Sequence, residues 1–199
     1  LLLLAGATVW MGIITAEALY PAAYNTHTQS VSDLAAMRPD NIVRQPSATI
    51  FNLSMILAGL AIAFAAYLLH RAGNVRGTTI PVAVLGLGMV GVGFFPGSHL
   101  AVHTLFSMIA FTAGGIGAIL TARMHSGPLR LVHRGLGIIS LTSLVVGGVF
   151  FVNWAPVTRL GEGGVERWVV YPVILWIVTF GAALASTRAP GDPVEASQG

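Results

Sequence analysis

Glu17 is the first residue whose chemistry stands out, because it is an acid inside a long apolar segment. A carboxylate within a membrane-spanning helix costs several kcal/mol unless a partner compensates its charge. Tyr20 and Tyr24 follow it, and a helix that continues through them would place all three side chains on one face. Asn25 then adds an amide. We expect these residues to form a polar site, or Glu17 to be paired with a residue elsewhere in the chain.

His99 and His103 form the second group with a meaningful spacing. Residues four apart project from one face of a helix, so two imidazoles can chelate one metal ion. Zinc needs at least a third protein ligand, for which Glu17, His27 or Asp33 are the nearby candidates. In a zinc hydrolase, Glu17, Asp33 and His103 would be the catalytic residues, with a carboxylate acting as base for metal-bound water. The alternative is a structural network in which His103 only hydrogen-bonds Glu17 or its neighbouring tyrosine.

Further polar candidates lie near the starts of two later apolar segments. Arg167 could form an ion pair with Glu17, or bind an anionic headgroup through two parallel hydrogen bonds. An ordinary charged flank at the membrane interface is the third interpretation of Glu166 and Arg167. A metal or lipid bound at Glu17 would make a working site, whereas Arg167 or His103 bound there would give Glu17 a structural role, and the sequence favours the structural role. The predicted ligand-binding residues are Tyr20, Tyr24, Asn25, Asn52, Glu166 and Arg167.

Composition assigns the chain to the membrane. Hydrophobic residues make up 55% of it and charged residues 9%, with a mean hydropathy of +0.79, whereas about 25% of a soluble domain is charged. Its apolar segments are long enough for helices that cross a bilayer, which takes roughly 20 residues. We predict an all-α integral membrane bundle of about six transmembrane helices, forming a single domain over 1–188. The predicted spans are 1–22, 49–70, 78–95, 100–123, 131–154 and 168–186.

The distribution of arginine predicts the topology. More Arg residues flank the helix ends on the side of the two termini, so both termini are expected in the cytoplasm of a multi-pass cell-membrane protein. The loop 23–48 then lies outside, where its apolar residues predict a short amphipathic helix. The tail 189–199 is polar and is expected to be disordered. We read the first segment as a retained helix, expect a few residues before Leu1, and take the absence of Lys to indicate a bacterial source.

Several functional classes are disfavoured by the sequence. The net charge of +3 comes from arginines scattered at segment ends, which is not the pattern of a nucleic-acid groove. The absence of Cys excludes thiolate metal sites. Haem is not expected, because His70 and His133 are the only candidate axial pair and both lie at helix ends among arginines. Small residues spaced by four predict close helix packing within the chain or, alternatively, a homo-oligomer contact. They are Ala110, Gly114 and Ala118.

A set of short motifs in a fixed order resembles a known family. They are E-x-x-Y-P-x-x-Y-N from Glu17, S-D-L from Ser32, F-N-x-S from Phe51, G-F-F-P before His103, and G-x-x-E-R ending at Arg167. Together they are similar to the prokaryotic domain-of-unknown-function family numbered nine hundred and ninety-eight. This resemblance implies a six-helix membrane fold and supplies no reaction. A looser likeness is to alkaline-ceramidase-type membrane hydrolases, although those have seven spans and a further histidine ligand.

Three functions remain open at this level. The first is a protein that binds or acts on a membrane lipid or another hydrophobic small molecule, with Glu17, Asp33, His99, His103 and Arg167 lining a pocket in the outer leaflet. An enzyme of this kind would be a membrane-embedded hydrolase, with zinc as its metal. The second is a non-catalytic structural or regulatory subunit. The third is a small-solute transporter, which the scarcity of ionisable residues at mid-membrane disfavours.

Overall fold

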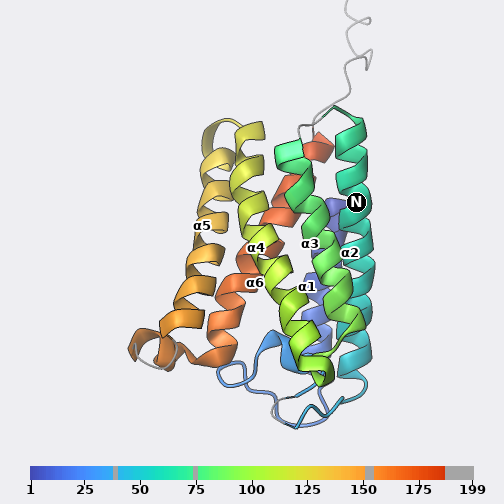
Figure 1. The fold of residues 1–199 in the computed structure, drawn as a ribbon, viewed down its shortest axis with the longest axis vertical. Coiled ribbons are helices and arrows are strands. Elements are labelled where there is room, and N and C mark those ends of the chain that lie inside the picture. Colours follow the sequence, from blue (N-terminus) through green and yellow to red (C-terminus); the bar gives the residue numbers. More distant parts are fainter. Residues whose placement is uncertain (38–39, 74–75, 151–154, 187–199) are drawn as a thin grey trace, which may run out of the picture.

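The chain folds into a bundle of helices (Figure 1). A computed structural model describes residues 1–37, 40–73, 76–150 and 155–186, and the elements within these ranges are helical, which confirms the all-α prediction. The predicted disordered tail lies outside the described residues. The long helices are α1 Leu2–Ala18, α2 Ser47–Arg71, α3 Arg76–Phe94, α4 Leu100–Thr121, α5 Gly127–Phe150 and α6 Ala155–Ser186, and the short 3₁₀ helices are η1 Val31–Leu34, η2 Gly97–His99 and η3 Ala122–Met124.

The helices have the length and hydropathy of membrane spans. In the described part of the chain, five of them are long and apolar enough to cross a bilayer, and α1 is a shorter apolar helix of 17 residues. Many of their large apolar side chains face outward, Leu4, Leu57 and Leu87 among them. A helix that exposes leucine along its length is stable only against lipid, so the protein spans a membrane.

Neighbouring helices pack in chain order, and α6 closes the bundle by packing against α1, α4 and α5. The glycine-rich α3 packs closely between two helices: a Cβ on Gly86 would meet the backbone of Gly59 in α2, and a Cβ on Gly88 would meet Ala110 in α4. Glycine at these positions lets the backbones approach closely, as membrane helix pairs require.

The small-residue stripe of α4 is used inside the chain. Ala110 packs against Gly88, a Cβ on Gly114 would meet Val173 of α6, and Ala118 is fully buried. These contacts account for the stripe by packing within the bundle. A homo-oligomer contact through the same residues stays a prediction.

Two of the helix boundaries that differ from the predicted ones matter for the site. α1 ends at Ala18 rather than at residue 22, because Pro21 disfavours a helical backbone at the preceding residue. Tyr20 and Tyr24 therefore do not extend the helical face of Glu17, as the sequence suggested, but approach it from a loop. At the other end α6 begins at Ala155, well before the predicted residue 168, and bends at Gly161, where φ is 76°.

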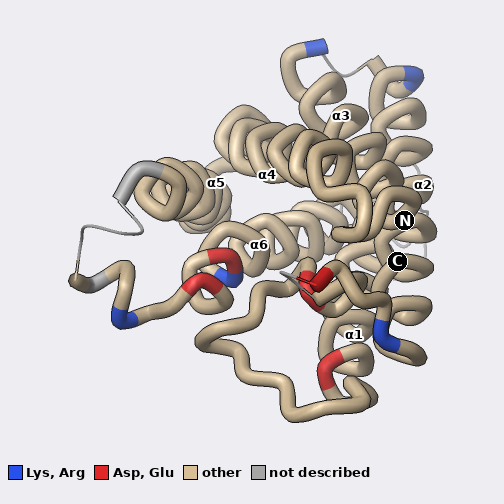
Figure 2. The backbone as a smooth tube through the Cα atoms, turned by 60° about the horizontal axis from the view of Figure 1, so that its bottom comes forward, with Lys and Arg blue, Asp and Glu red and all other residues tan. Residues whose placement is uncertain are grey.

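The described loop residues 19–37 and 40–46 cover one end of the bundle, which we call the loop end (bottom of Figure 1). The expected amphipathic segment is the single turn η1, which buries Val31 and Leu34. Every acidic residue in the described part of the chain lies at this end (Figure 2). Five arginines lie at the opposite end, in or next to the α2–α3 and α4–α5 connections: Arg71, Arg76, Arg123, Arg130 and Arg134.

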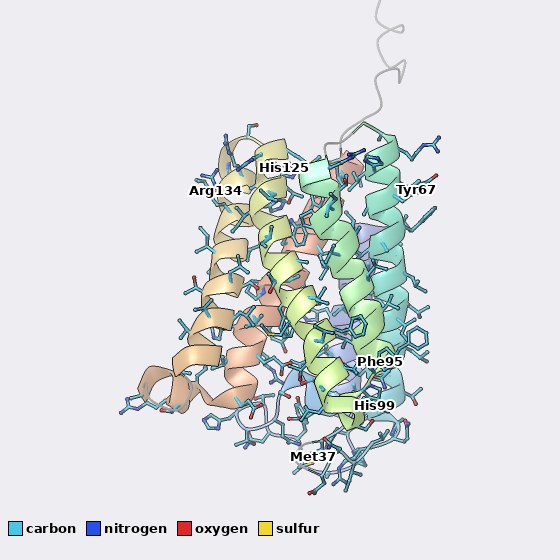
Figure 3. All side chains as sticks on the ribbon, in the orientation of Figure 1. Met37, Tyr67, Phe95, His99, His125 and Arg134 are labelled. Carbon is cyan, nitrogen blue, oxygen red and sulfur yellow. The ribbon has the colours of Figure 1, made fainter. Side chains whose placement is uncertain are left out.

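A histidine pair lies at the end opposite the loop end (Figure 3). The rings of His125 and His133 are 4.8 Å apart, both pack against Phe180, and Nε2 of His133 lies 3.1 Å from Oγ1 of Thr179. His70, which together with His133 was the only candidate pair of axial haem ligands, is exposed. Burial lowers the pKa of His125 below its usual value.

This lowered pKa predicts a pH-dependent stability. The pKa of an unfolded-state histidine is about 6.5, so below this pH the unfolded chain binds a proton at His125 more readily than the folded chain does. The free energy of unfolding should therefore fall as the pH drops from about 7.5 toward 5. Thermal unfolding in detergent micelles at several pH values measures this slope. His125→Gln should make this slope smaller, and an unchanged slope in that variant would contradict the assignment.

Candidate functional site

Arg167 is the centre of a polar network at the loop end. Its Nη2 donates to Oε1 of Glu17 at 2.5 Å and to the hydroxyl of Tyr24 at 3.0 Å, and its guanidinium lies 5.6 Å from the centre of the Tyr24 ring. The side chains of Arg167 and Glu17 are only 11% and 23% exposed. We call Glu17, Tyr24 and Arg167 the clasp. Its ion pair supplies the compensation that a carboxylate in a membrane protein requires.

The clasp also holds the loop against α6. Nη1 of Arg167 donates to the main-chain oxygens of Thr26, Gln29 and Gly163, at 3.2, 3.1 and 2.9 Å. The hydroxyl of Tyr24 donates a hydrogen bond to the main-chain oxygen of Ser30 at 2.6 Å. Burial raises the pKa of Tyr24, so the phenol stays a neutral donor. One guanidinium thus ties a loop and two helices together.

Glycines on α6 allow this close approach. A Cβ on Gly163 would collide with the main-chain oxygens of Thr26 and Gln29, and a Cβ on Gly161 would collide with that of His27. Gly161 also has a positive φ, which glycine adopts without strain. The bend leaves the amide of Gly163 able to donate to the His27 oxygen at 3.1 Å.

The turn η1 is fixed by two carboxylates. Asp33 accepts from the amide of Ser30 at 2.8 Å while the Ser30 hydroxyl accepts from the amide of Asp33, which is a capping box. Glu166 of α6 accepts from the amide of Val31 at 2.7 Å. The predicted catalytic residue Asp33 is buried and serves this turn, whereas Glu166 joins η1 to α6.

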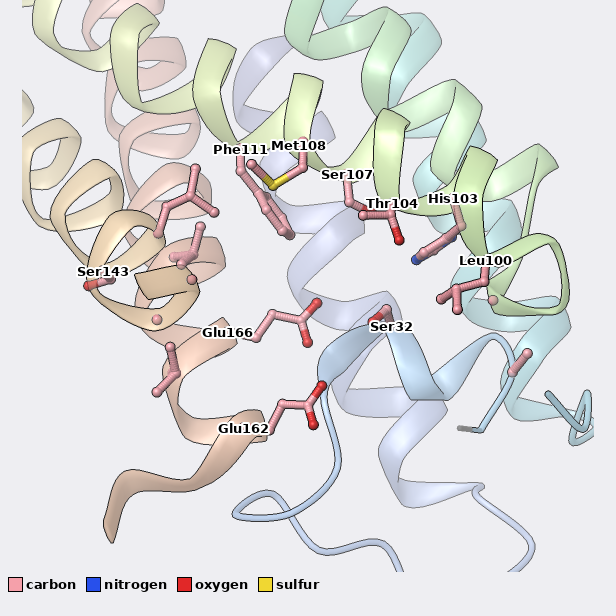
Figure 4. A pocket seen from close by; sticks show the side chains of 17 residues that line it. Ser32, Leu100, His103, Thr104, Ser107, Met108, Phe111, Ser143, Glu162 and Glu166 are labelled. Carbon is pink, nitrogen blue, oxygen red and sulfur yellow. The ribbon is translucent and has the colours of Figure 1, made fainter. Parts of the chain in front are cut away.

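A cavity of about 490 Å³ lies beside this turn, between α4, α5 and α6 (Figure 4). We call it the outer cleft. Its volume falls in the range of small-molecule sites. The apolar part of its wall includes Met108, Phe111, Leu144, Val165 and Val169. Its polar lining is Ser32, His103, Thr104, Ser107, Ser143, Glu162 and Glu166.

The two histidines of the predicted chelating pair are separated by the start of α4. His103 is buried in the helix, its Nδ1 donates to the main-chain oxygen of Phe95 at 2.7 Å, and it lines the cleft. His99 precedes the helix with a non-helical backbone (φ −106°, ψ 56°) and is exposed, so the pair does not share a helical face as predicted. Within the described ranges, no three His, Cys, Asp or Glu residues are grouped so that they could hold a metal ion. The described residues therefore offer no set of ligands that would support the zinc hypothesis.

Comparison with known proteins settles the family. The family model described as "Protein of unknown function (DUF998)" matches residues 3–183. The chain belongs to the DUF998 family. Searches of curated proteins and of solved structures found no match, so the looser likeness to alkaline-ceramidase-type hydrolases is not supported.

The remaining predicted residues of the DUF998 chain do not line the cleft. Tyr20 is buried with its ring 5.2 Å from that of Tyr24, and burial raises its pKa. Asn25 shapes the loop by accepting from the amide of His27 at 2.9 Å. Asn52 lies on α2, and its main-chain oxygen approaches Gly93 of α3. Glu17 is likewise held in the clasp, so of the predicted residues only His103 and Glu166 line the cleft.

Sequence reasoning missed Glu162 and the hydroxyl residues of the cleft. Glu162 precedes Glu166 by one helical turn, a spacing that places two side chains on one face. Because α6 was expected to begin at 168, both glutamates were assigned to a loop. Their spacing therefore did not indicate a shared helical face. The serines and threonine give no comparable pattern, since they are common in membrane helices as internal hydrogen-bonding residues.

Proposed function

We propose that this DUF998 protein binds one amphiphilic molecule, a lipid or a similar hydrophobic compound, in the outer cleft. The observation that carries the proposal is the composition of this cavity, which combines carboxylates, an imidazole and hydroxyls with an apolar wall. Such a lining suits a ligand with a polar head and an apolar tail. The tail would lie against Met108, Phe111 and Leu144, and the head near Glu166.

A second, smaller cavity supports the same function. It has a volume of about 60 Å³ and lies inside the bundle, with an almost entirely apolar lining that includes Met55, Met89 and Leu85. It shares Ser107 and Phe111, among other residues, with the outer cleft. The polar cleft therefore continues into an apolar space, as a site for an amphiphile requires.

The charge distribution supports an outer-leaflet site. Arginines concentrate at the end opposite the loop end, and the positive-inside rule assigns such an end to the cytoplasm. On this topology both termini are cytoplasmic in the cell membrane and the cleft lies in the outer leaflet. Blocking the loop end with an impermeant label on intact cells, through a cysteine placed at the exposed Asp40, would test the orientation.

The clasp residues Glu17, Tyr24 and Arg167 suit a structural role, and they are not residues of the cleft. Glu17 and Arg167 satisfy each other and the loop, as a non-catalytic membrane subunit would need. This second function, a structural or regulatory subunit, concerns the clasp side of α6. Binding in the cleft concerns Glu162 and Glu166, so the two functions are separable by variants.

Filling the cleft should abolish binding. Gly148 lines the cleft and a Cβ added there meets nothing within 4 Å, so Gly148→Trp should fill space without a clash. We expect lipid retained by native mass spectrometry, from vesicles of phosphatidylethanolamine and phosphatidylglycerol, to fall by about tenfold or more, equivalent to 1.4 kcal/mol.

The matched control is Gly135→Trp, on the same helix. Gly135 is equally open but lies outside the cleft lining. It should retain lipid as the parent protein does. Equal retention by Gly148→Trp, Gly135→Trp and the parent, all with parental thermal stability, would exclude the cleft as the binding site.

A further inference from the structure

The smaller cavity inside the bundle, which we call the inner cavity, is lined by residues of α1, α2, α3, α4, α6 and η1. Apart from three polar residues that it shares with the outer cleft, its described lining is apolar. Ile13, Leu85, Ile174 and Ile177 belong to this lining, and each is at most 3% exposed. Water would find few hydrogen-bond partners in such a space, so an apolar group is the occupant that suits it.

Four described residues line both the inner cavity and the outer cleft, and we call them the neck: Ser32, Ser107, Phe111 and Glu166. Ser107 and Phe111 lie one turn apart on α4, and Figure 4 shows them across from Glu166 of α6 and Ser32 of η1. Phe111 contributes the large apolar side chain of this set. A group that passes from the cleft into the centre of the bundle therefore passes the ring of Phe111.

The volume of the inner cavity limits the kind of tail that it can hold. An apolar protein cavity of about 150 Å³ binds benzene, whereas the inner cavity has a volume of about 60 Å³. A ring is too large for this space, but the end of a flexible alkyl chain fits. Met55 and Met89 also line it, and the unbranched methionine side chain adapts its shape to a neighbouring group.

We infer that the tail of the ligand is an open alkyl chain, and that its end passes Phe111 and fills the inner cavity. This inference rests on the proposed function and adds the tail chemistry to it. An empty apolar cavity costs stability in proportion to its volume, so a chain end that fills it gains affinity. Lipids with fatty acyl chains meet this requirement, whereas sterols and other fused-ring lipids do not.

A competition between lipids with matched tails tests this chemistry. The full-length protein is placed in nanodiscs that contain equal amounts of dioleoyl phosphatidylethanolamine and its analogue with two ω-phenyldodecanoyl chains, which have the same number of carbons. The same pair of tails is then used on phosphatidylglycerol. Retained lipid is identified by native mass spectrometry. The oleoyl lipid should be favoured about tenfold, the ratio expected for filling an apolar cavity of this size.

Leu85→Phe should remove this preference. Leu85 lines the inner cavity from α3 and is not among the residues of the outer cleft, so the larger side chain fills the inner space alone. Retention of the oleoyl lipid should fall about tenfold, and retention of the phenyl-ended lipid should stay unchanged. Leu87→Phe is the matched control, because it makes the same exchange on the same helix at a residue that is 60% exposed, and it should keep the parental ratio.

Phe111→Ala should change the ratio by the opposite route. Removal of the ring widens the neck and leaves a space that can itself receive a ring. Retention of the phenyl-ended lipid should therefore rise toward that of the oleoyl lipid. Both lipids compete for the same sample, so the ratio reports the folded fraction of each variant whatever its stability.

The outcomes separate the tail chemistry from the proposed function. Equal retention of the two lipids by the parent protein, at a level that Gly148→Trp lowers, overturns the tail assignment and leaves lipid binding intact. A preference that persists in Leu85→Phe, or is lost equally in Leu87→Phe, also overturns it, because the chain end would then lie outside the inner cavity. If Phe111→Ala retains no more of the phenyl-ended lipid than the parent, the path past Phe111 is wrong. Retention of neither lipid with either headgroup removes the proposed function itself.

Discussion

Replacing Arg167 with glutamine is expected to lower the free energy of unfolding by about 3 kcal/mol, the lower end of the usual cost of removing one partner of a buried ion pair, because this pair is only partly buried. The carboxylate of Glu17 would be left without its partner, and the loop oxygens of Thr26 and Gln29 would lose their donor. In a chain of this size such a loss corresponds to a decrease in Tm of about 10 °C. Thermal unfolding of the purified protein in dodecyl maltoside micelles measures it.

Arg159→Gln is the control for charge and side-chain type. Arg159 is exposed on the same helix, and its contact with His27 uses the main-chain oxygen, so the cost should stay within about 0.5 kcal/mol. In a double-mutant cycle with Glu17→Gln, the second substitution should restore part of the loss, with a coupling of at least about 1 kcal/mol. Additive effects would show that Glu17 and Arg167 do not stabilise each other.

The sequence limited the possible partners of Glu17 because few polar residues were available. A carboxylate in an apolar segment requires compensation, and Arg167 and His103 were among the few candidates expected at the same end of the bundle. The structure pairs Glu17 with Arg167. Hydropathy likewise predicted a membrane protein, because a segment of about 20 apolar residues has few alternatives to a membrane-spanning helix.

The cleft could not be predicted in this way. Its walls come from three helices and a turn, and the space between them depends on how α5 packs against α4 and α6 rather than on a local pattern. The start of α6 could not be predicted from the sequence either. The bend at Gly161 depends on the main chain of His27, which packs against it. Glu162 consequently appeared as a loop residue instead of the partner of Glu166.

The clasp and the cleft meet on one turn of α6. Arg167 binds the loop on one side, while Glu166 binds Val31 and lines the cleft on the other. The loop residues between Thr26 and Val31 are therefore fixed by adjacent residues of a single helix. A change that lifts this loop should move Ser32 and open the end of the cleft, which couples loop docking to ligand retention.

Gly163→Ala should produce that lifting, with a loss of about 1–3 kcal/mol from overpacking. Its Cβ would collide with the main-chain oxygens of Gln29 and Thr26, which have no flexible end that could move aside. The loop must shift, and the bonds from Arg167 to the same two oxygens must lengthen with it. Hydrogen exchange of residues 24–34, measured by mass spectrometry, should accelerate, and Tm should fall.

Gly164→Ala is the matched control on the next residue. A Cβ there would meet only the side chain of Leu160, which is partly exposed and can rotate. In a helix, alanine is favoured over glycine by about 1 kcal/mol, so the control should be neutral or slightly stabilising. The same propensity acts in Gly163→Ala, so a net loss there must come from the contact with the loop. If both variants gain stability and exchange remains slow in residues 24–34, the loop is not held by close packing on α6, and the cleft does not depend on it.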